Sequence, residues 1–151
     1  MSKESRIFSP TVWGAQDTIT HYESFGWELL SINGNQITMS RETQNPVYPE
    51  LVKFQAKYED LALQLANLRA PACPEPLPPV NFKFAIIGFI CLIVPGAIYV
   101  AYKVNKKKEF DAAMQEYREK YAAYQATRQQ LLEKMKATAA DSRAVFFSKQ
   151  G

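Results

Sequence analysis

The chain has 151 residues, of which 47% are hydrophobic and 22% charged, and its formal net charge is +3. This composition is typical of a folded protein, and the charge is too small for a nucleic-acid-binding protein. The two cysteines, Cys73 and Cys91, are too far apart to indicate a metal-binding or redox pair.

Residues 5–42 predict a small head with the element order βαββ. Residues 6–8 form a short strand, Ser9 can cap the helix that follows, and Pro10 suits the first helical position because its missing N–H has no partner there. Gly26 is predicted to end this helix in a left-handed conformation. Apolar side chains recur at steps of three or four and define one face of the helix: Val12, Ala15, Ile19, Tyr22 and Phe25.

A β-hairpin is predicted to follow the helix. Asn33 and Gly34 are typical of a type I′ turn, in which both residues have positive φ. This turn would place Leu30 opposite Ile37. On the other side of the hairpin, Trp27 and Leu29 form a candidate patch for a protein partner. The alternative is that Trp27 packs on a neighbouring helix.

A second, amphipathic helix is predicted over residues 49–70. Proline-rich residues 71–81 follow it and favour an extended, semi-rigid linker. The apolar residues of the helix alternate steps of three and four, as in the a/d seam of a coiled coil: Leu51, Phe54, Tyr58, Leu61, Leu65 and Leu68.

Residues 82–104 predict one transmembrane helix. Residues 84–102 carry no charge, and as a helix they would be about 28 Å long, close to the ~30 Å hydrocarbon core of a bilayer. Pro95 and Gly96 would kink this helix, or they would form the turn of a re-entrant hairpin. A helix buried in a soluble core is the remaining alternative.

Basic and aromatic residues flank this segment and are typical of anchors at a membrane surface. The excess of lysines after the segment places the C-terminal half in the cytoplasm, so the expected location is the cell membrane, with a single pass. The predicted anchors are Lys83, Tyr102, Lys103, Lys106, Lys107 and Lys108.

Residues 105–140 predict a long amphipathic helix that forms a coiled coil or a helical hairpin, or else stands as a single solvated stalk. Arg128 interrupts its apolar seam with a charge. The tail, residues 141–151, contains a short β-favouring run, residues 144–147, that could add a strand to the head. The seam consists of Phe110, Met114, Tyr117, Tyr121, Tyr124, Leu131 and Met135.

Two segments resemble known groups of proteins. "FGWELLSINGNQITMSRE" resembles the GWEL-plus-hairpin segment of small bacterial βαββ domains of unknown function. "PGAIYVAYKVNKKKEF" resembles the junction between an apolar helix and a lysine-rich helix in small membrane proteins of Firmicutes. The resemblance implies an uncharacterised bacterial membrane protein, and it implies no catalytic residues.

The sequence therefore predicts an α+β protein without enzymatic activity and without a cofactor or metal. His21, the single histidine, is interpreted as a surface residue of the first helix. The expected function is a single-pass membrane anchor or scaffold whose head and helices bind protein partners or self-associate. Its partners would be the lipid bilayer and other proteins, and neither nucleic acid nor a small-molecule substrate. The alternative is a membrane-active oligomer, either a pore or a bilayer-remodelling protein, that uses the re-entrant Pro95-Gly96 hairpin.

Overall fold

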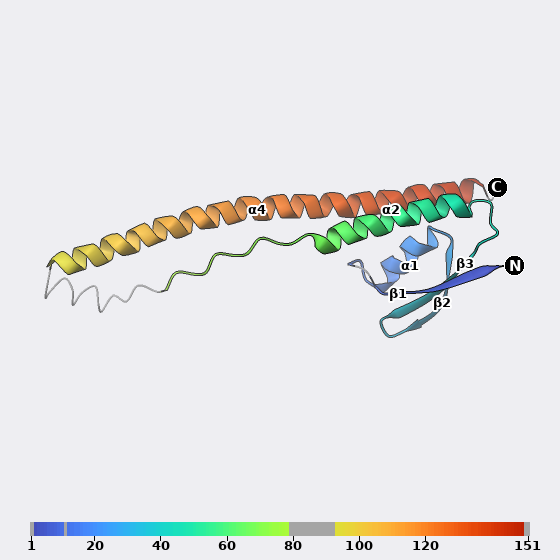
Figure 1. The fold of residues 1–151 in the computed structure, drawn as a ribbon, viewed down its shortest axis with the longest axis horizontal. Coiled ribbons are helices and arrows are strands. Elements are labelled where there is room, and N and C mark those ends of the chain that lie inside the picture. Colours follow the sequence, from blue (N-terminus) through green and yellow to red (C-terminus); the bar gives the residue numbers. More distant parts are fainter. Residues whose placement is uncertain (1, 11, 79–92, 150–151) are drawn as a thin grey trace. The chain divides into compact units, whose positions relative to one another are not determined.

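The computed structural model describes residues 2–10, 12–78 and 93–149 and shows an α+β protein, in which a small antiparallel sheet is combined with helices (Figure 1). The chain divides into two compact units, Met1–Leu68 with Thr127–Gly151, and Arg69–Ala126, which are described separately here. In chain order the elements are β1 (Lys3–Phe8), α1 (Ala15–Glu23), β2 (Trp27–Asn33), β3 (Gln36–Glu42), α2 (Tyr48–Asn67) and α4 (Ile93–Ser148).

The three strands form a sheet in the order β1-β3-β2, with β3 antiparallel to both neighbours. Side chains alternate between the faces of a strand, so Ile37 and Met39 of β3 lie on the same face, and both are fully buried. Phe8 of β1 pairs with Ile37, and its ring stacks on that of Tyr22 in α1 with the centroids 3.9 Å apart. This face of the sheet is therefore the one covered by helices.

The β2–β3 hairpin turns one residue later than the sequence predicted. Asn33 pairs with Gln36, so the two-residue loop consists of Gly34 and Asn35. Gly34 has φ +60°, and none of the described non-glycine residues has positive φ. A single glycine with positive φ at the first loop position is the pattern of a type II′ turn, whereas a type I′ turn requires two such residues.

The later turn changes the register of the hairpin. Ile32 lies opposite Ile37, in place of the predicted Leu30. A bulge between Leu29 and Ser31 leaves Leu30 without a partner in the register. The prediction was wrong because an Asn-Gly pair can occupy either of two adjacent positions in a hairpin, and cross-strand packing selects one of them.

Helix α1 begins at Ala15, five residues after the predicted start. Gly14 precedes it with φ 86° and ψ 177°, a conformation open mainly to glycine, and no side chain caps the helix. Ser9 is therefore not its cap. Gly26 has the expected left-handed conformation, with φ +79°. Of the predicted helix face, Ile19, Tyr22 and Phe25 are buried, Ala15 is partly buried and Val12 is exposed.

Helices cover the sheet in two further layers (Figure 1). Helices α1 and α2 lie against the sheet, and the C-terminal part of α4 packs over them. Leu131, Met135 and Ala139 of α4 belong to the same core as the side chains of the sheet. The hydroxyl of Ser142 donates a hydrogen bond of 2.8 Å to the carbonyl oxygen of Ser24, at the end of α1. The last turns of the chain are thus part of the core of the N-terminal unit.

The residues of the predicted seam of the second helix form a packed face. Helix α2 runs antiparallel to α4, and its first turn lies next to the end of α4, where Lys149 forms an ion pair of 2.7 Å with Glu50. Leu51, Tyr58, Leu61 and Leu65 are buried, and Phe54 and Leu68 are partly buried.

Arg41 is a charged residue inside this core, with 5% of its side chain exposed. Its guanidinium lies 2.6 Å from a carboxylate oxygen of Glu4 on β1. It also donates hydrogen bonds of 3.1 Å to the carbonyl oxygen of Phe25 and 3.0 Å to the side-chain oxygen of Gln55 on α2. A single side chain on the central strand therefore connects the sheet, the chain after α1, and α2.

Aromatic rings complete the surroundings of Arg41. Its guanidinium lies 4.6 Å from the ring centroid of Trp27 and 4.8 Å from that of Tyr48, within the range of cation–π attraction. The indole N–H of Trp27 donates a 2.9 Å hydrogen bond to Gln55. Trp27 is 3% exposed, so it packs on the neighbouring helix and does not form a surface patch.

The predicted single-pass membrane topology is wrong. It separates the head from the C-terminal helix by a bilayer, yet both contribute to one core. Across the ranges that the structure describes, no helix contains an apolar stretch long enough to cross a membrane. Of the predicted segment, residues 93–104 belong to α4. Residues 82–92 of the predicted segment lie outside the described residues. The predicted cell-membrane location depended on this topology and is therefore not supported either.

Two further predictions for this region change. Pro95 and Gly96 lie within α4 and form no hairpin turn. Residues 144–147 are helical and add no strand to the sheet. Residues 69–78 have no regular secondary structure, and residues 79–81 of the predicted linker lie outside the described residues.

We expect Arg41→Leu to lower the free energy of unfolding by about 3–5 kcal/mol, because it leaves the partners of a buried charge unsatisfied. The measurement is urea denaturation followed by circular dichroism. Arg6→Leu is the matched control, because the ion pair of Arg6 with Glu59 is exposed and contributes about 1 kcal/mol at most. The double variant Glu4→Leu/Arg41→Leu should recover part of the loss. Equal effects of Arg41→Leu and Arg6→Leu would contradict this role of Arg41.

Candidate functional site

The apolar seam of α4 keeps the same spacing of three and four residues along the helix, but its residues lie in very different environments. In the N-terminal unit, its residues follow steps of four, three and four and are buried: Leu131, Met135, Thr138 and Ser142. Thr138 continues the spacing of the predicted seam, whereas Ser142 was not predicted as a core residue. Their hydroxyls donate hydrogen bonds to the carbonyl oxygens of Lys134 and Ser24, which allows these polar residues to be buried.

The same seam continues toward the N-terminus of α4, in the unit Arg69–Ala126. Phe110, Met114, Tyr117 and Tyr124 are half-buried there, and Tyr121 is 39% exposed. The rings of Tyr117 and Tyr121 stack with centroids 5.7 Å apart, and those of Tyr121 and Tyr124 are 5.9 Å apart. The described residues of this unit outside α4, residues 69–78, have no regular secondary structure. No coiled coil is therefore observed along this part of the seam.

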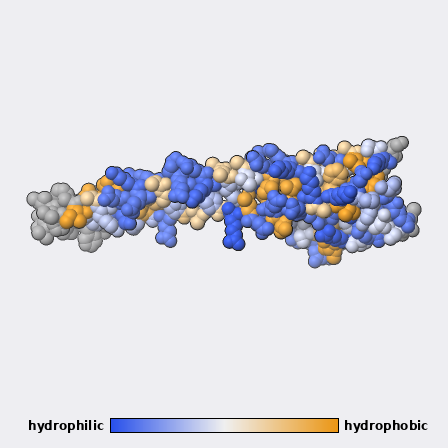
Figure 2. Space-filling view, turned by 45° about the horizontal axis from the view of Figure 1, so that its top comes forward, coloured by the Kyte–Doolittle hydropathy of each residue, from blue (hydrophilic) through white to orange (hydrophobic). Residues whose placement is uncertain are grey.

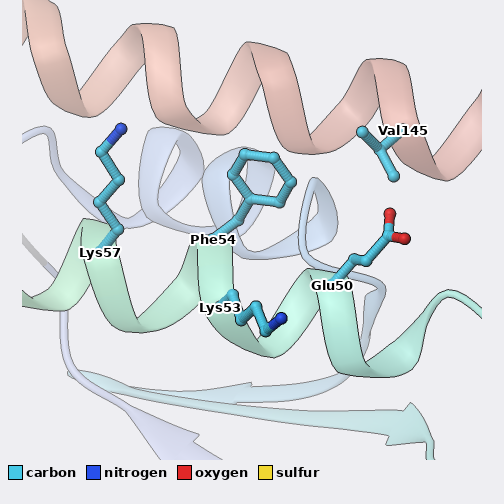
Figure 3. Close-up of a pocket in the computed structure, with 5 residues that line it drawn as sticks. All are labelled: Glu50, Lys53, Phe54, Lys57 and Val145. Carbon is cyan, nitrogen blue, oxygen red and sulfur yellow. The ribbon is translucent and has the colours of Figure 1, made fainter.

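A groove between α2 and α4 is a second candidate site (Figure 3). Its volume is about 340 Å³, and its lining is almost entirely apolar at the surface, with Phe54 of α2 and Val145 of α4 as its two apolar residues. Lys53, Lys57 and Glu50, all on α2, form its edges. On the side shown in Figure 2, apolar side chains reach the surface between hydrophilic ones over the unit that contains α2 and the C-terminal part of α4. The sequence placed Phe54 in the seam of α2 but gave no indication of a groove, because the facing helix is distant in the chain.

The edge strand β2 carries exposed apolar side chains. Leu29 of the predicted partner patch is 42% exposed, and Leu30 and Ile32 are 58% and 51% exposed. Of the predicted pair, only Leu29 is therefore at the surface, since Trp27 is buried. The bulge at Leu30 interrupts the regular edge, which is a common protection against the pairing of exposed strands.

The predicted anchors have ordinary helix-surface environments where the structure describes them. Lys106 forms an ion pair of 3.0 Å with Glu109, and its ammonium lies 5.9 Å from the ring of Tyr102. Lys103 lies 5.8 Å from the ring of Tyr99. Lys107 and Lys108 are exposed. Lys83 lies outside the described residues.

His21 is more enclosed than the sequence indicated. Its Nδ1 lies 2.7 Å from the hydroxyl oxygen of Tyr58 on α2, and its ring meets that of Trp13 edge-on with centroids 5.5 Å apart. Burial lowers the pKa of His21 below its usual value of 6.5. The negative charge of Asp17 opposes this shift, and the positive charges of Lys136 and Arg143 on α4 add to it. The imidazole thus joins α1 to α2 next to two cations of α4.

Within residues 2–10, 12–78 and 93–149, no group of three or more His, Cys, Asp or Glu side chains is placed to hold a metal ion. No protein-family model, curated protein or solved structure matches this chain.

The lowered pKa of His21 predicts that stability falls as the solution becomes acidic. Below about pH 6.5 the unfolded chain binds a proton at this residue while the folded chain still resists it, so protonation favours unfolding. We expect the urea midpoint to fall between about pH 7.5 and about pH 5.5, and to fall less in His21→Gln. An identical fall in both proteins would show that other groups cause the pH dependence.

Proposed function

We propose that this protein is a non-enzymatic scaffold that self-associates through the seam of α4 and presents its α+β unit to protein partners. The observation that supports the proposal is the continuity of the seam. Residues 131–142 of α4 use it to pack inside the protein, and residues 110–124 repeat the same spacing without a second helix among the described residues of their own unit, 69–78 and 93–126. A helix from a second copy of the chain could pack against residues 110–124. These residues would then be packed in the way that residues 131–142 already are.

The side chains of this seam are suited to association. Tyrosine buries a large area at a low cost in side-chain entropy, and its hydroxyl can stay in contact with water at the edge of an interface. The rings of Tyr117, Tyr121 and Tyr124 already contact one another along the helix, so part of that entropy is lost before binding. Their half-exposed state suits an interface that forms and dissociates more readily than a core of leucines.

Arg128 stands at a seam position between the buried and the accessible residues. A charged residue at one core position of a coiled coil weakens association but favours a single register. Arg128 is half-buried. We infer that it limits the length of the contact, so that self-association uses residues 110–124 and leaves the packing of residues 131–142 within each copy intact.

We expect the full-length chain to self-associate, and Met114→Glu/Tyr121→Glu to raise the dissociation constant by at least about tenfold, because each carboxylate would be buried without a partner. Sedimentation equilibrium over a range of concentrations measures this. Ala112→Glu/Ala122→Glu is the matched control, since it adds the same charge at exposed positions off the seam. The proposal fails if the wild type is monomeric throughout, or if both double variants associate like the wild type.

Arg128→Leu tests the limiting role of the arginine. We expect it to lower the dissociation constant of the full-length chain by about tenfold, equivalent to about 1.4 kcal/mol, because a charge no longer has to be desolvated near the interface. The same sedimentation experiment gives the result. Unchanged or weaker association would place Arg128 outside the contact.

A further inference from the structure

The groove between α2 and α4 has an apolar centre and a basic edge. Figure 3 shows the ring of Phe54 between the two helices, with Val145 pointing toward the groove from α4. Phe54 and Val145 are both partly exposed, so the groove is open to a ligand from solution. Lys57 and Glu50 lie on opposite sides of Phe54 (Figure 3).

Of the charged residues that line the groove, the acidic one forms an ion pair and, within the described ranges, the two basic ones do not. Glu50 forms an ion pair of 2.7 Å with Lys149, so its negative charge is neutralised within the protein. Lys53 and Lys57 are both exposed, and in the described part of the chain neither forms an ion pair. They are four residues apart on α2, and like charges at this spacing repel each other across one helical turn. A negative charge from a ligand would relieve that repulsion.

We propose that this groove binds an acidic amphipathic helix of a partner protein. The apolar face of that helix lies along the groove and places one side chain against Phe54 and Val145. Two carboxylates one turn apart on the partner helix, at i and i+4, face Lys53 and Lys57, because one turn is about 5.4 Å in both helices. Recognition of an amphipathic helix by a groove between two helices is a common mode of peptide binding.

The shape of the groove favours a helix as its ligand. Its volume of about 340 Å³ holds one or two large side chains, and it is bounded by helices on both long sides. A third helix laid along α2 and α4 would extend the helical layer and cover Phe54. The apolar contact provides affinity, and the two lysines select an acidic partner over a basic one.

This inference rests on the proposed scaffold function, but it concerns a different surface. Self-association uses residues 110–124 of α4, whereas the groove is formed by residues 50–57 and 145 in the other unit. A failure of one can therefore be distinguished from a failure of the other by measuring both in the same samples.

The probe is a synthetic, fluorescently labelled helical peptide with leucines at i, i+3, i+4 and i+7 and glutamates beside them. A matched peptide carries lysine in place of every glutamate. Fluorescence anisotropy measures binding of each to the full-length chain. We expect the glutamate peptide to bind and the lysine peptide to bind at least about tenfold more weakly, because the latter meets Lys53 and Lys57 with like charge.

Variants locate the contact. Lys53→Glu/Lys57→Glu should weaken binding of the glutamate peptide at least about tenfold. Lys107→Glu/Lys108→Glu makes the same change of charge on exposed residues of α4 outside the groove, and should leave binding unchanged. Val145→Glu should also abolish binding, because it places a charge in the apolar lining of the groove, while circular dichroism confirms that the helices remain folded.

Four results would overturn the inference. The first is that the glutamate peptide does not bind the wild type, and the second is that both peptides bind equally well. The third is that Lys53→Glu/Lys57→Glu and Lys107→Glu/Lys108→Glu lose the same amount of binding. The fourth is that folded Val145→Glu binds the glutamate peptide as well as the wild type does. Sedimentation of the same samples provides a further test. If the peptide dissociates a dimer of the full-length chain, a second copy occupies the groove, and a separate partner is excluded.

Discussion

The burial of Arg41 is the constraint on which the N-terminal unit depends. A guanidinium cannot be removed from water unless its N–H groups find acceptors, and here they come from β1, from the chain after α1, and from α2. The partners of Arg41 therefore have to be in place together. Gln55 serves two donors at once, because its side-chain oxygen accepts hydrogen bonds from both Arg41 and Trp27. A charged group in the core thus fixes how α2 lies on the sheet, which apolar contacts alone would specify less sharply.

The last turns of α4 complete this unit, and they give the long helix two roles. Where α4 packs over α1 and α2, its seam contains small polar residues, Thr138 and Ser142, which are buried because their hydroxyls bond to backbone carbonyls. Where the seam continues in the other unit, it consists of Met114 and large aromatic residues, and these side chains remain partly exposed. Small residues allow close approach to an existing layer, and large residues provide area for a partner. The two parts of one seam thus differ in composition, since small polar residues follow Leu131 and Met135 in the buried part and tyrosines predominate in the other, in agreement with the proposed scaffold function.

Much of the secondary structure followed from local patterns in the sequence. The strands, the amphipathic helix after Pro49 and the periodicity of the long C-terminal helix were all predicted, because alternation and heptad spacing are properties of short segments. The failures occurred at boundaries. The start of α1 depends on the backbone of Gly14, and the position of the hairpin turn depends on packing between strands. The membrane prediction relied on local features, the apolar run of residues 84–102 and the basic and aromatic residues that flank it. It could not take into account that residues 131–142, far along the chain, pack in the core of the head.

The sequence by itself determined that this chain is an α+β protein with a small βαββ head and two helices with apolar seams. It did so because each of those features repeats within a few residues. Only the tertiary structure decided which residues share a core and which meet at a surface. Trp27 is buried because Gln55 accepts its N–H, and Phe54 lines a groove because Val145 faces it from 91 positions further along the chain. Contacts at such separations depend on the path of the whole chain, and no local pattern of residue types specifies that path.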